Sequence, residues 1–116
     1  MGMLFYGSGR LAIPIDDVVL AHLKILATSK LRRSEAFLLS WVDHSDAGGG
    51  RSSAWIHPAL ELHYRFDGET RPKIDPAVVE EMAREANQAR GIELTDRILT
   101  HDPHEDDVAT TSVPVG

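Results

Sequence analysis

Alternation of apolar and polar residues predicts most of the strands of this chain. Apolar runs at 3–6 and 11–13 flank the turn "GSGR", a pattern typical of a β-hairpin whose second strand ends at Pro14. The run "SEAFLLSWVDH" is apolar on both faces, which indicates a central strand whose second face is buried or partly buried. The loop "DHSDAGGG" reverses the chain into the strand "RSSAWIH". The segment "ALELHYRFD" then alternates cleanly and is expected to direct inward Leu60, Leu62, Tyr64 and Phe66.

Two further stretches follow the helical period and carry residues typical of helix boundaries. The first predicted helix covers residues 16–31, with Asp16 or Asp17 as its N-cap. The second lies within 75–90, where Asp75 is the N-cap, Pro76 the first helical residue and Gly91 the residue just past the end. Its expected buried stripe consists of Val79, Met82, Ala83 and Ala86. The segment "GIELT" predicts a short final strand.

The order of elements is therefore ββ-α-βββ-α-β. Because short turns join neighbouring strands, we expect an α+β domain with one mainly antiparallel sheet of five or six strands and two helices packed on one face. A length of 116 residues suits one domain, which we place at residues 1–95. Residues 96–116 are acidic and then lack any periodicity, so we expect a disordered tail there.

Composition removes several classes of function. Cysteine is absent, which excludes disulfides, thiolate nucleophiles and cysteine-ligated metal sites. No apolar run is long enough for a membrane span and the N-terminus lacks a signal-peptide pattern, so we expect a cytoplasmic protein without membrane partners. No catalytic triad is evident. Residues of types that bind metals occur in the tail at His101, Asp102, His104 and Glu105. A metal site there would have to offset the cost of ordering that segment. We predict no metal, no cofactor and no catalytic residue.

The net charge of −6 is unevenly distributed. Residues 96–107 hold five acidic residues and one arginine, whereas residues 18–34 contain no acid and four cations, Lys24, Lys30, Arg32 and Arg33. These cations, together with Arg51, would contact the phosphates of a nucleic acid or another polyanion. The alternative is that they compensate the dipole at the helix C-terminus. The acidity of the whole chain argues against strong non-specific binding to nucleic acid.

The run "GGGRSSAWIHP" at 48–58 combines glycines, a cation, hydroxyls and aromatic rings. A phosphate-binding loop requires a helix after its glycines, whereas a strand is predicted here, so we expect a hairpin tip. On a strand, one face would carry Arg51, Ser53, Trp55 and His57, which suits a phosphate and a stacked base. The alternative, which we favour, buries Trp55 in the core. His22, on the apolar face of the first helix, is expected to be a core histidine with its ring nitrogens satisfied.

The blocks "KLRRSEAFLLSW" and "GRSSAWIHP", followed by "ARGIEL", resemble those of a group of small actinobacterial proteins, a domain of unknown function, over roughly residues 3–95. Members of the group are often labelled ATP-dependent DNA ligase. That label implies transfer of AMP to the lysine of a K-x-D-G motif, and the nearest match here is "KIDP" at 73–76. Its proline and its aspartate are better explained as a helix start. The chain is also too short for a ligase core, so we do not expect a free-standing ligase.

Three hypotheses follow. The first is a binding module for nucleic acid or another polyanion, with a site formed by Lys24, Lys30, Arg32, Arg33, Arg51, Ser53 and His57. The second is a protein-interaction domain that forms a homodimer through an exposed strand edge. The third, an accessory role beside ATP-dependent DNA ligase activity, rests on the resemblance alone.

Overall fold

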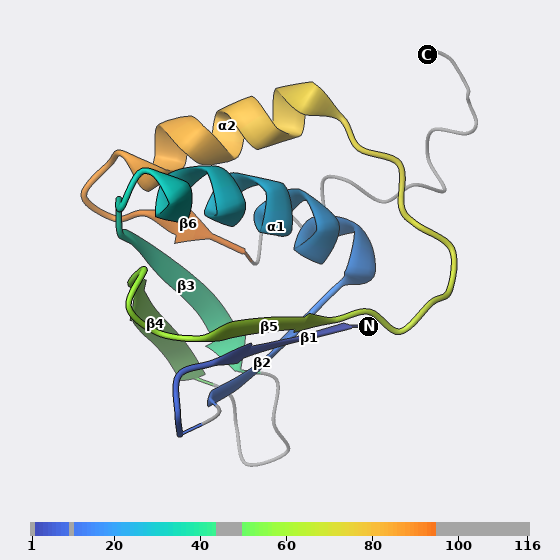
Figure 1. Ribbon diagram of the computed structural model, residues 1–116, viewed down its shortest axis with the longest axis horizontal. Coiled ribbons are helices and arrows are strands. Elements are labelled where there is room, and N and C mark those ends of the chain that lie inside the picture. The colour runs from blue at the N-terminus through green and yellow to red at the C-terminus, as the bar shows by residue number, and fades with distance from the viewer. Residues whose placement is uncertain (1, 10, 44–49, 95–116) are drawn as a thin grey trace.

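The computed structural model describes residues 2–9, 11–43 and 50–94, and across them six strands and two helices follow the predicted order ββ-α-βββ-α-β (Figure 1). The elements are β1 Gly2–Tyr6, β2 Leu11–Ile15, α1 Asp17–Arg32, β3 Phe37–Asp43, β4 Gly50–Ile56, β5 Leu62–Arg65, α2 Pro76–Ala86 and β6 Ile92–Glu93. The α+β class is therefore confirmed. The predicted tail, 96–116, and the tip of the β3–β4 hairpin, 44–49, lie outside the described residues.

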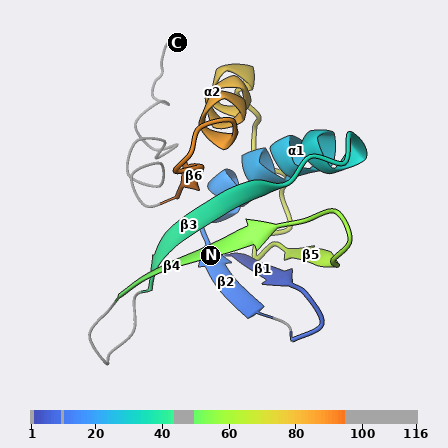
Figure 2. The same ribbon diagram turned by 90° about the vertical axis from the view of Figure 1, so that its left-hand side faces the viewer.

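The strands form two three-stranded sheets where one sheet was expected. In the first, β1 pairs in antiparallel fashion with both β2 and β5; in the second, β3 pairs antiparallel with β4 and parallel with β6. Between the sheets, a side chain and not a strand binds the end of β4. The Tyr6 hydroxyl donates a hydrogen bond to the Trp55 carbonyl oxygen (2.5 Å) and accepts one from the His57 N–H (3.0 Å). Both ribbon views show the helices together on one side of the strands (Figure 1, Figure 2).

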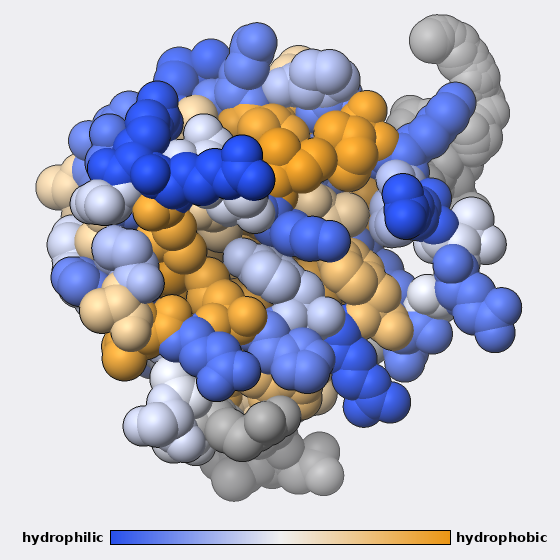
Figure 3. Space-filling view, viewed as in Figure 1, coloured by the Kyte–Doolittle hydropathy of each residue, from blue (hydrophilic) through white to orange (hydrophobic). Residues whose placement is uncertain are grey.

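The core is one cluster of apolar side chains between the helices and the two sheets. The central strand β3 directs alternate residues into it, Phe37, Leu39 and Trp41, as expected for a strand with one buried face. The largest contribution from a helix comes from α1, with Val19, Leu20, Leu23, Leu26 and Ala27. On the surface seen in Figure 3, apolar side chains lie between hydrophilic ones.

Two boundaries differ from the predictions. β2 continues through Pro14 to Ile15, because β2 is an edge strand and a proline that lacks an N–H is tolerated there. α2 ends at Ala86, several residues before Gly91. The positive φ of Gly91 (69°) and its close approach to β3 explain this glycine, since an added Cβ would lie 2.3 Å from the Leu38 carbonyl oxygen.

Two predicted core positions are also wrong. Leu60 is exposed, because it precedes β5 in a turn in which its N–H donates to the His57 carbonyl oxygen. In α2 the buried valine is Val78 rather than Val79, and Met82, four residues later, lies on the same face. Ala83 and other partly buried residues complete that face, as predicted.

Two polar contacts hold α2 against α1, one near each end of α2. Near the start, the buried His22 ring lies 2.7 Å through Nδ1 from the Val18 carbonyl oxygen and accepts at Nε2 a hydrogen bond from the Asp75 N–H (2.9 Å). Because Nε2 accepts, the proton of the neutral ring lies on Nδ1. The prediction of a satisfied core histidine is confirmed. Near the other end, Lys30 Nζ donates to Oδ1 of the C-cap residue Asn87 (2.6 Å).

The connection from β5 to α2 is held by the Asp17 carboxylate at the start of α1. This carboxylate accepts hydrogen bonds from the N–H groups of Asp67 (3.1 Å) and Gly68 (2.9 Å). Burial raises the pKa of Asp17, but hydrogen bonds from the Gly68 and Asp67 backbones lower it, and the net pKa is below the ordinary value of 3.8. The folded state therefore favours the ionised carboxylate.

We expect Asp17 to make the domain sensitive to acid. A lowered pKa in the folded state contributes stability that is present above pH 3.8 and is lost as the pH falls through the folded-state pKa. Denaturant unfolding of the Asp17→Asn variant between pH 6 and about pH 3 should therefore show a smaller loss of stability than wild type. Glu80→Gln, on the exposed surface of α2, is the matched control. Parallel profiles for wild type and Asp17→Asn would contradict this role.

Candidate functional site

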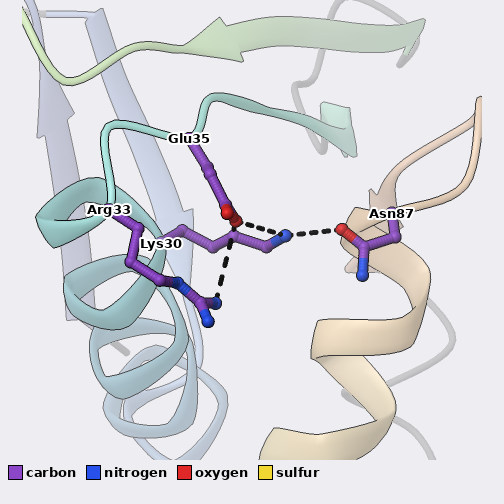
Figure 4. Close-up of polar contacts among 4 residues, drawn as sticks. All are labelled: Lys30, Arg33, Glu35 and Asn87. Atoms are coloured by element: carbon purple, nitrogen blue, oxygen red, sulfur yellow. Dashed lines mark hydrogen bonds and ion pairs between the residues drawn. The ribbon is translucent and has the colours of Figure 1, made fainter.

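Lys30, predicted to bind anions at the surface, is buried at 4% exposure. Its ammonium donates to Glu35 Oε1 (3.1 Å) and to Asn87 Oδ1 (2.6 Å), so it connects the end of α1 to the end of α2 (Figure 4). Arg33 Nη2 lies 3.7 Å from the same Glu35 oxygen. The Glu35 carboxylate thus offsets two cations of the predicted cluster. Lys30 has a structural position and is not part of an accessible anion site.

The turn after α1 brings Glu35 back over Lys30. The Ser34 N–H donates to the Leu31 carbonyl oxygen and the Glu35 N–H to the Lys30 carbonyl oxygen, both at 3.0 Å, which is the hydrogen-bond pattern of a Schellman motif. Ser34 occupies the position where glycine is most common, with a φ of 58°. A left-handed conformation costs a serine about 1 kcal/mol or more. The run "LRRSE" is thereby explained as a helix end.

The remaining predicted cations do not converge. Lys24 and Arg32 are exposed on α1, and the Lys24 ammonium lies 5.8 Å from the centroid of the Phe66 ring, within reach of a cation–π interaction. Arg51 projects from the opposite side of the second sheet, because the helices cover the face of β3 that carries Phe37 and Leu39. The structure therefore separates Arg51 from the cations of α1 by the thickness of a sheet.

Trp55 is exposed at 59%, so the prediction that it packs into the core is wrong. The register pairs Trp55 with Leu38, whose side chain points away from the helices. The inward positions of β4 are taken by Ala54, which packs against the core, and by Ile56, which is fully buried. Trp55 therefore lies on the outer face of this sheet. We call this surface the Trp55 face and define it by Leu38, Ser40, Val42, Arg51, Ser53, Trp55 and Glu93.

The Trp55 face carries polar groups that are paired with each other. The hydroxyl oxygens of Ser40 and Ser53, directly opposite each other on β3 and β4, lie 2.7 Å apart. Arg51 Nη2 lies 3.8 Å from Glu93 Oε2, with side chains 75% and 38% exposed. An ion pair this open to water contributes about 0–1 kcal/mol. Its consequence is electrostatic, because one cation and one anion leave the face without net charge.

The residues around Trp55 have structural roles of their own. The Tyr6 hydroxyl binds the Trp55 carbonyl oxygen and the His57 N–H, and Ile56 between them is in the core. His57 Nδ1 accepts a hydrogen bond from the Ala59 N–H (3.1 Å), which closes the turn after β4. Packing and hydrogen bonding thus explain "IHP". Within the part of the chain that the structure describes, the exposed indole of Trp55 makes no hydrogen bond or ring contact that would give it a role in the fold.

Sequence reasoning missed part of this surface. Residues Leu38, Val42 and Glu93 belong to it, and the alternation in "FLLSWV" already places the first two on one side of a strand. Only the register of the hairpin and the parallel pairing of β6 with β3 bring them beside Trp55 and Arg51. No local pattern predicts either pairing.

Other candidate chemistries find no support among the described residues. No three His, Asp or Glu side chains in this part of the chain gather into a group that could hold a metal ion, and the tail ligands considered above lie outside it. Asp75 accepts a hydrogen bond from the Ala77 N–H (3.0 Å) as N-cap of α2, so "KIDP" is a helix start, as predicted. Within the same residues, neither helix is long and apolar enough to cross a membrane.

A family model for a domain of unknown function, DUF7882, matches residues 1–97. The chain belongs to the DUF7882 family. The match covers both sheets, both helices and the whole Trp55 face. No match was found among curated proteins, and none among solved structures. The resemblance noted from the sequence is thus confirmed as membership of a domain family, without an activity attached to it.

In this DUF7882 domain we expect the loss of Glu35 to be more harmful than the loss of Lys30. Glu35→Ala leaves a buried ammonium without a counter-ion and should cost roughly 3 kcal/mol of unfolding free energy. Lys30→Met removes the hydrogen bond to Asn87 as well, but it leaves an exposed amide and a carboxylate that is 46% exposed, both hydrated by water, so we expect a loss of about 1 kcal/mol. Urea unfolding measures both. The double variant should be more stable than Glu35→Ala alone, and equal losses from the two single changes would contradict this account.

Proposed function

We propose that this domain is a non-enzymatic protein-interaction module that binds its partner through the Trp55 face. The observation that carries the proposal is the indole of Trp55, exposed at 59% on a strand whose alternate residues fill the core. Tryptophan and arginine are enriched among the hot-spot residues near the centres of protein interfaces, and Arg51 lies on the same face. Leu38 beside the indole and Val42 beside Arg51 add partly buried apolar surface to the face.

The apolar area of Trp55 that a partner could cover is large enough to support a contact centred on this residue. A tryptophan side chain buries about 150–250 Å² when it is covered completely, and apolar area removed from water contributes about 25 cal/mol per Å². Covering the exposed part of this indole therefore offers a few kcal/mol before the cost of association. That is the scale of an interface hot spot.

The charges on the Trp55 face favour a protein over a nucleic acid. Arg51, Ser53, Trp55 and His57 are all exposed, as a base-stacking site would require. However, Glu93 lies beside Arg51 and would repel a phosphate placed there. Polyanion binding then rests on the cations of α1, of which Lys30 is buried and Arg33 is paired. Binding of nucleic acid is therefore the alternative that the following experiment distinguishes.

The test is photo-crosslinking in the cells that make the protein naturally, with a photoreactive aromatic residue in place of Ser53. This position lies between Arg51 and Trp55 on the face, so a bound protein should be captured as a defined crosslinked band. The same probe at Thr28, exposed on α1, is the positional control. Adding Trp55→Ala to the Ser53 probe should remove the band, because the indole supplies most of the contact.

Three results would contradict the proposal. They are the absence of a polypeptide crosslink at position 53, an identical band from position 28, and a band that persists with Trp55→Ala. A crosslinked species that nuclease removes would instead support the nucleic-acid hypothesis. Circular dichroism on each purified variant confirms that the probes do not unfold the domain.

A further inference from the structure

We infer that the partner on the Trp55 face is a second copy of this chain, packed face to face about a two-fold axis; this inference rests on the proposed function. In such an interface a patch meets its own copy, so each group must find its complement within the patch. The Trp55 face satisfies this condition in its outer rows, since it presents an exposed indole, Trp55, and an exposed cation, Arg51, whose charge Glu93 of the same copy balances. A partner with a strongly charged surface would gain little from a face without net charge.

The register of the strands divides the face into three rows. Arg51 lies opposite Val42 in the first row, Ser53 opposite Ser40 in the middle row, and Trp55 opposite Leu38 in the third. A two-fold axis along the middle row, perpendicular to the strands, exchanges the outer rows between the copies. The row with Trp55 then covers the row with Arg51 of the second copy.

Two of the pairings made by this exchange are favourable. Trp55 of one copy stacks on the Arg51 guanidinium of the other, a cation–π contact that forms twice. Leu38 of one copy meets Val42 of the other, which buries apolar surface on both. Glu93 pairs with Ser40 in the middle row, so the two Glu93 carboxylates face each other across the axis. Their repulsion is reduced because each stays beside the Arg51 of its own copy.

Packing through the face does not depend on the edges of β4, β6 and β2, each of which is poorly suited to the strand addition considered from the sequence. The backbone edge of β4 is closed at its end, where the Tyr6 hydroxyl binds the Trp55 carbonyl oxygen and the His57 N–H. At the other edge of the same sheet, β6 has two residues. The edge strand β2 of the first sheet contains Pro14, a residue that protects edges from pairing.

The size of the face predicts a weak and reversible dimer. Strands lie about 4.8 Å apart and rise about 3.3 Å per residue, so three strands with the seven-residue β3 at the centre span roughly 14 by 23 Å. The buried area is then a few hundred Å² per copy, below the roughly 800 Å² of a standard interface. We expect a dissociation constant on the order of 100 μM.

Sedimentation equilibrium of the full chain, from about 1 μM to 1 mM, measures this association directly. Wild type should show a monomer–dimer equilibrium, and Trp55→Ala and Arg51→Ala should each weaken it at least about tenfold. Ile25→Ala, which removes a large apolar side chain exposed on α1, is the matched control and should leave the equilibrium unchanged.

A mixture of the two weakened variants tests the two-fold arrangement. Each homodimer lacks both Trp55–Arg51 contacts, whereas the heterodimer keeps one, between Trp55 of the Arg51→Ala copy and Arg51 of the Trp55→Ala copy. The mixture should therefore associate more tightly than either variant alone, and association no tighter than theirs would overturn the arrangement. Dimerisation that Trp55→Ala does not weaken would overturn the use of this face.

A wild type that stays monomeric throughout would overturn the second copy as partner. The proposed function would survive that result if the Ser53 probe captured a different polypeptide, so the two failures are distinguishable.

Discussion

The relation between the two sheets depends on the Tyr6 hydroxyl, which reaches from β1 to the end of β4. It donates to the Trp55 carbonyl oxygen and accepts from the His57 N–H, so it takes the place of a neighbouring strand. Because these two groups are turned toward Tyr6, the intervening Ile56 is directed into the core and the Trp55 side chain is directed away from it. The exposure of the Trp55 face is thus a consequence of how the sheets are joined.

Several residues of types that are common in functional sites have structural roles in this domain. His22 fixes the start of α2 through the Asp75 N–H, Lys30 fixes its end through Asn87, and His57 closes the turn after β4. The two buried side chains among them, His22 and Lys30, have hydrogen-bond partners, as buried polar groups require. The candidates for binding are therefore the exposed groups that have no structural role among the described residues, and the indole of Trp55 is the largest of them.

The parts of the structure that local physics determines could be predicted from the sequence. Both helix starts follow from caps, Asp16 for α1 and the Asp75–Pro76 pair for α2, and the strands follow from alternation. The burial of Lys30 could not be predicted, because it requires Asn87, which is 57 residues away in the sequence.

The position of Trp55 could not be predicted for a related reason. A strand's alternation defines two faces but does not say which one meets the core when both carry large apolar residues. In β4 the face that packs against the core is determined by the register with β3 and by the hydrogen bond to Tyr6, and both of these contacts are long-range. The position of Glu93 could not be predicted for the same reason, because Glu93 lies on the face only through the pairing of β6 with β3.

The central claim is that the Trp55 side chain faces water in the isolated domain, and fluorescence quenching tests it most directly. In a Trp41→Phe variant, which removes the buried tryptophan, Trp55 is the remaining tryptophan of the chain. In dilute solution its emission should resemble that of free tryptophan, and acrylamide should quench it nearly as efficiently. Blue-shifted emission that resists acrylamide at the lowest concentrations would show that Trp55 is buried within the domain and would contradict the account.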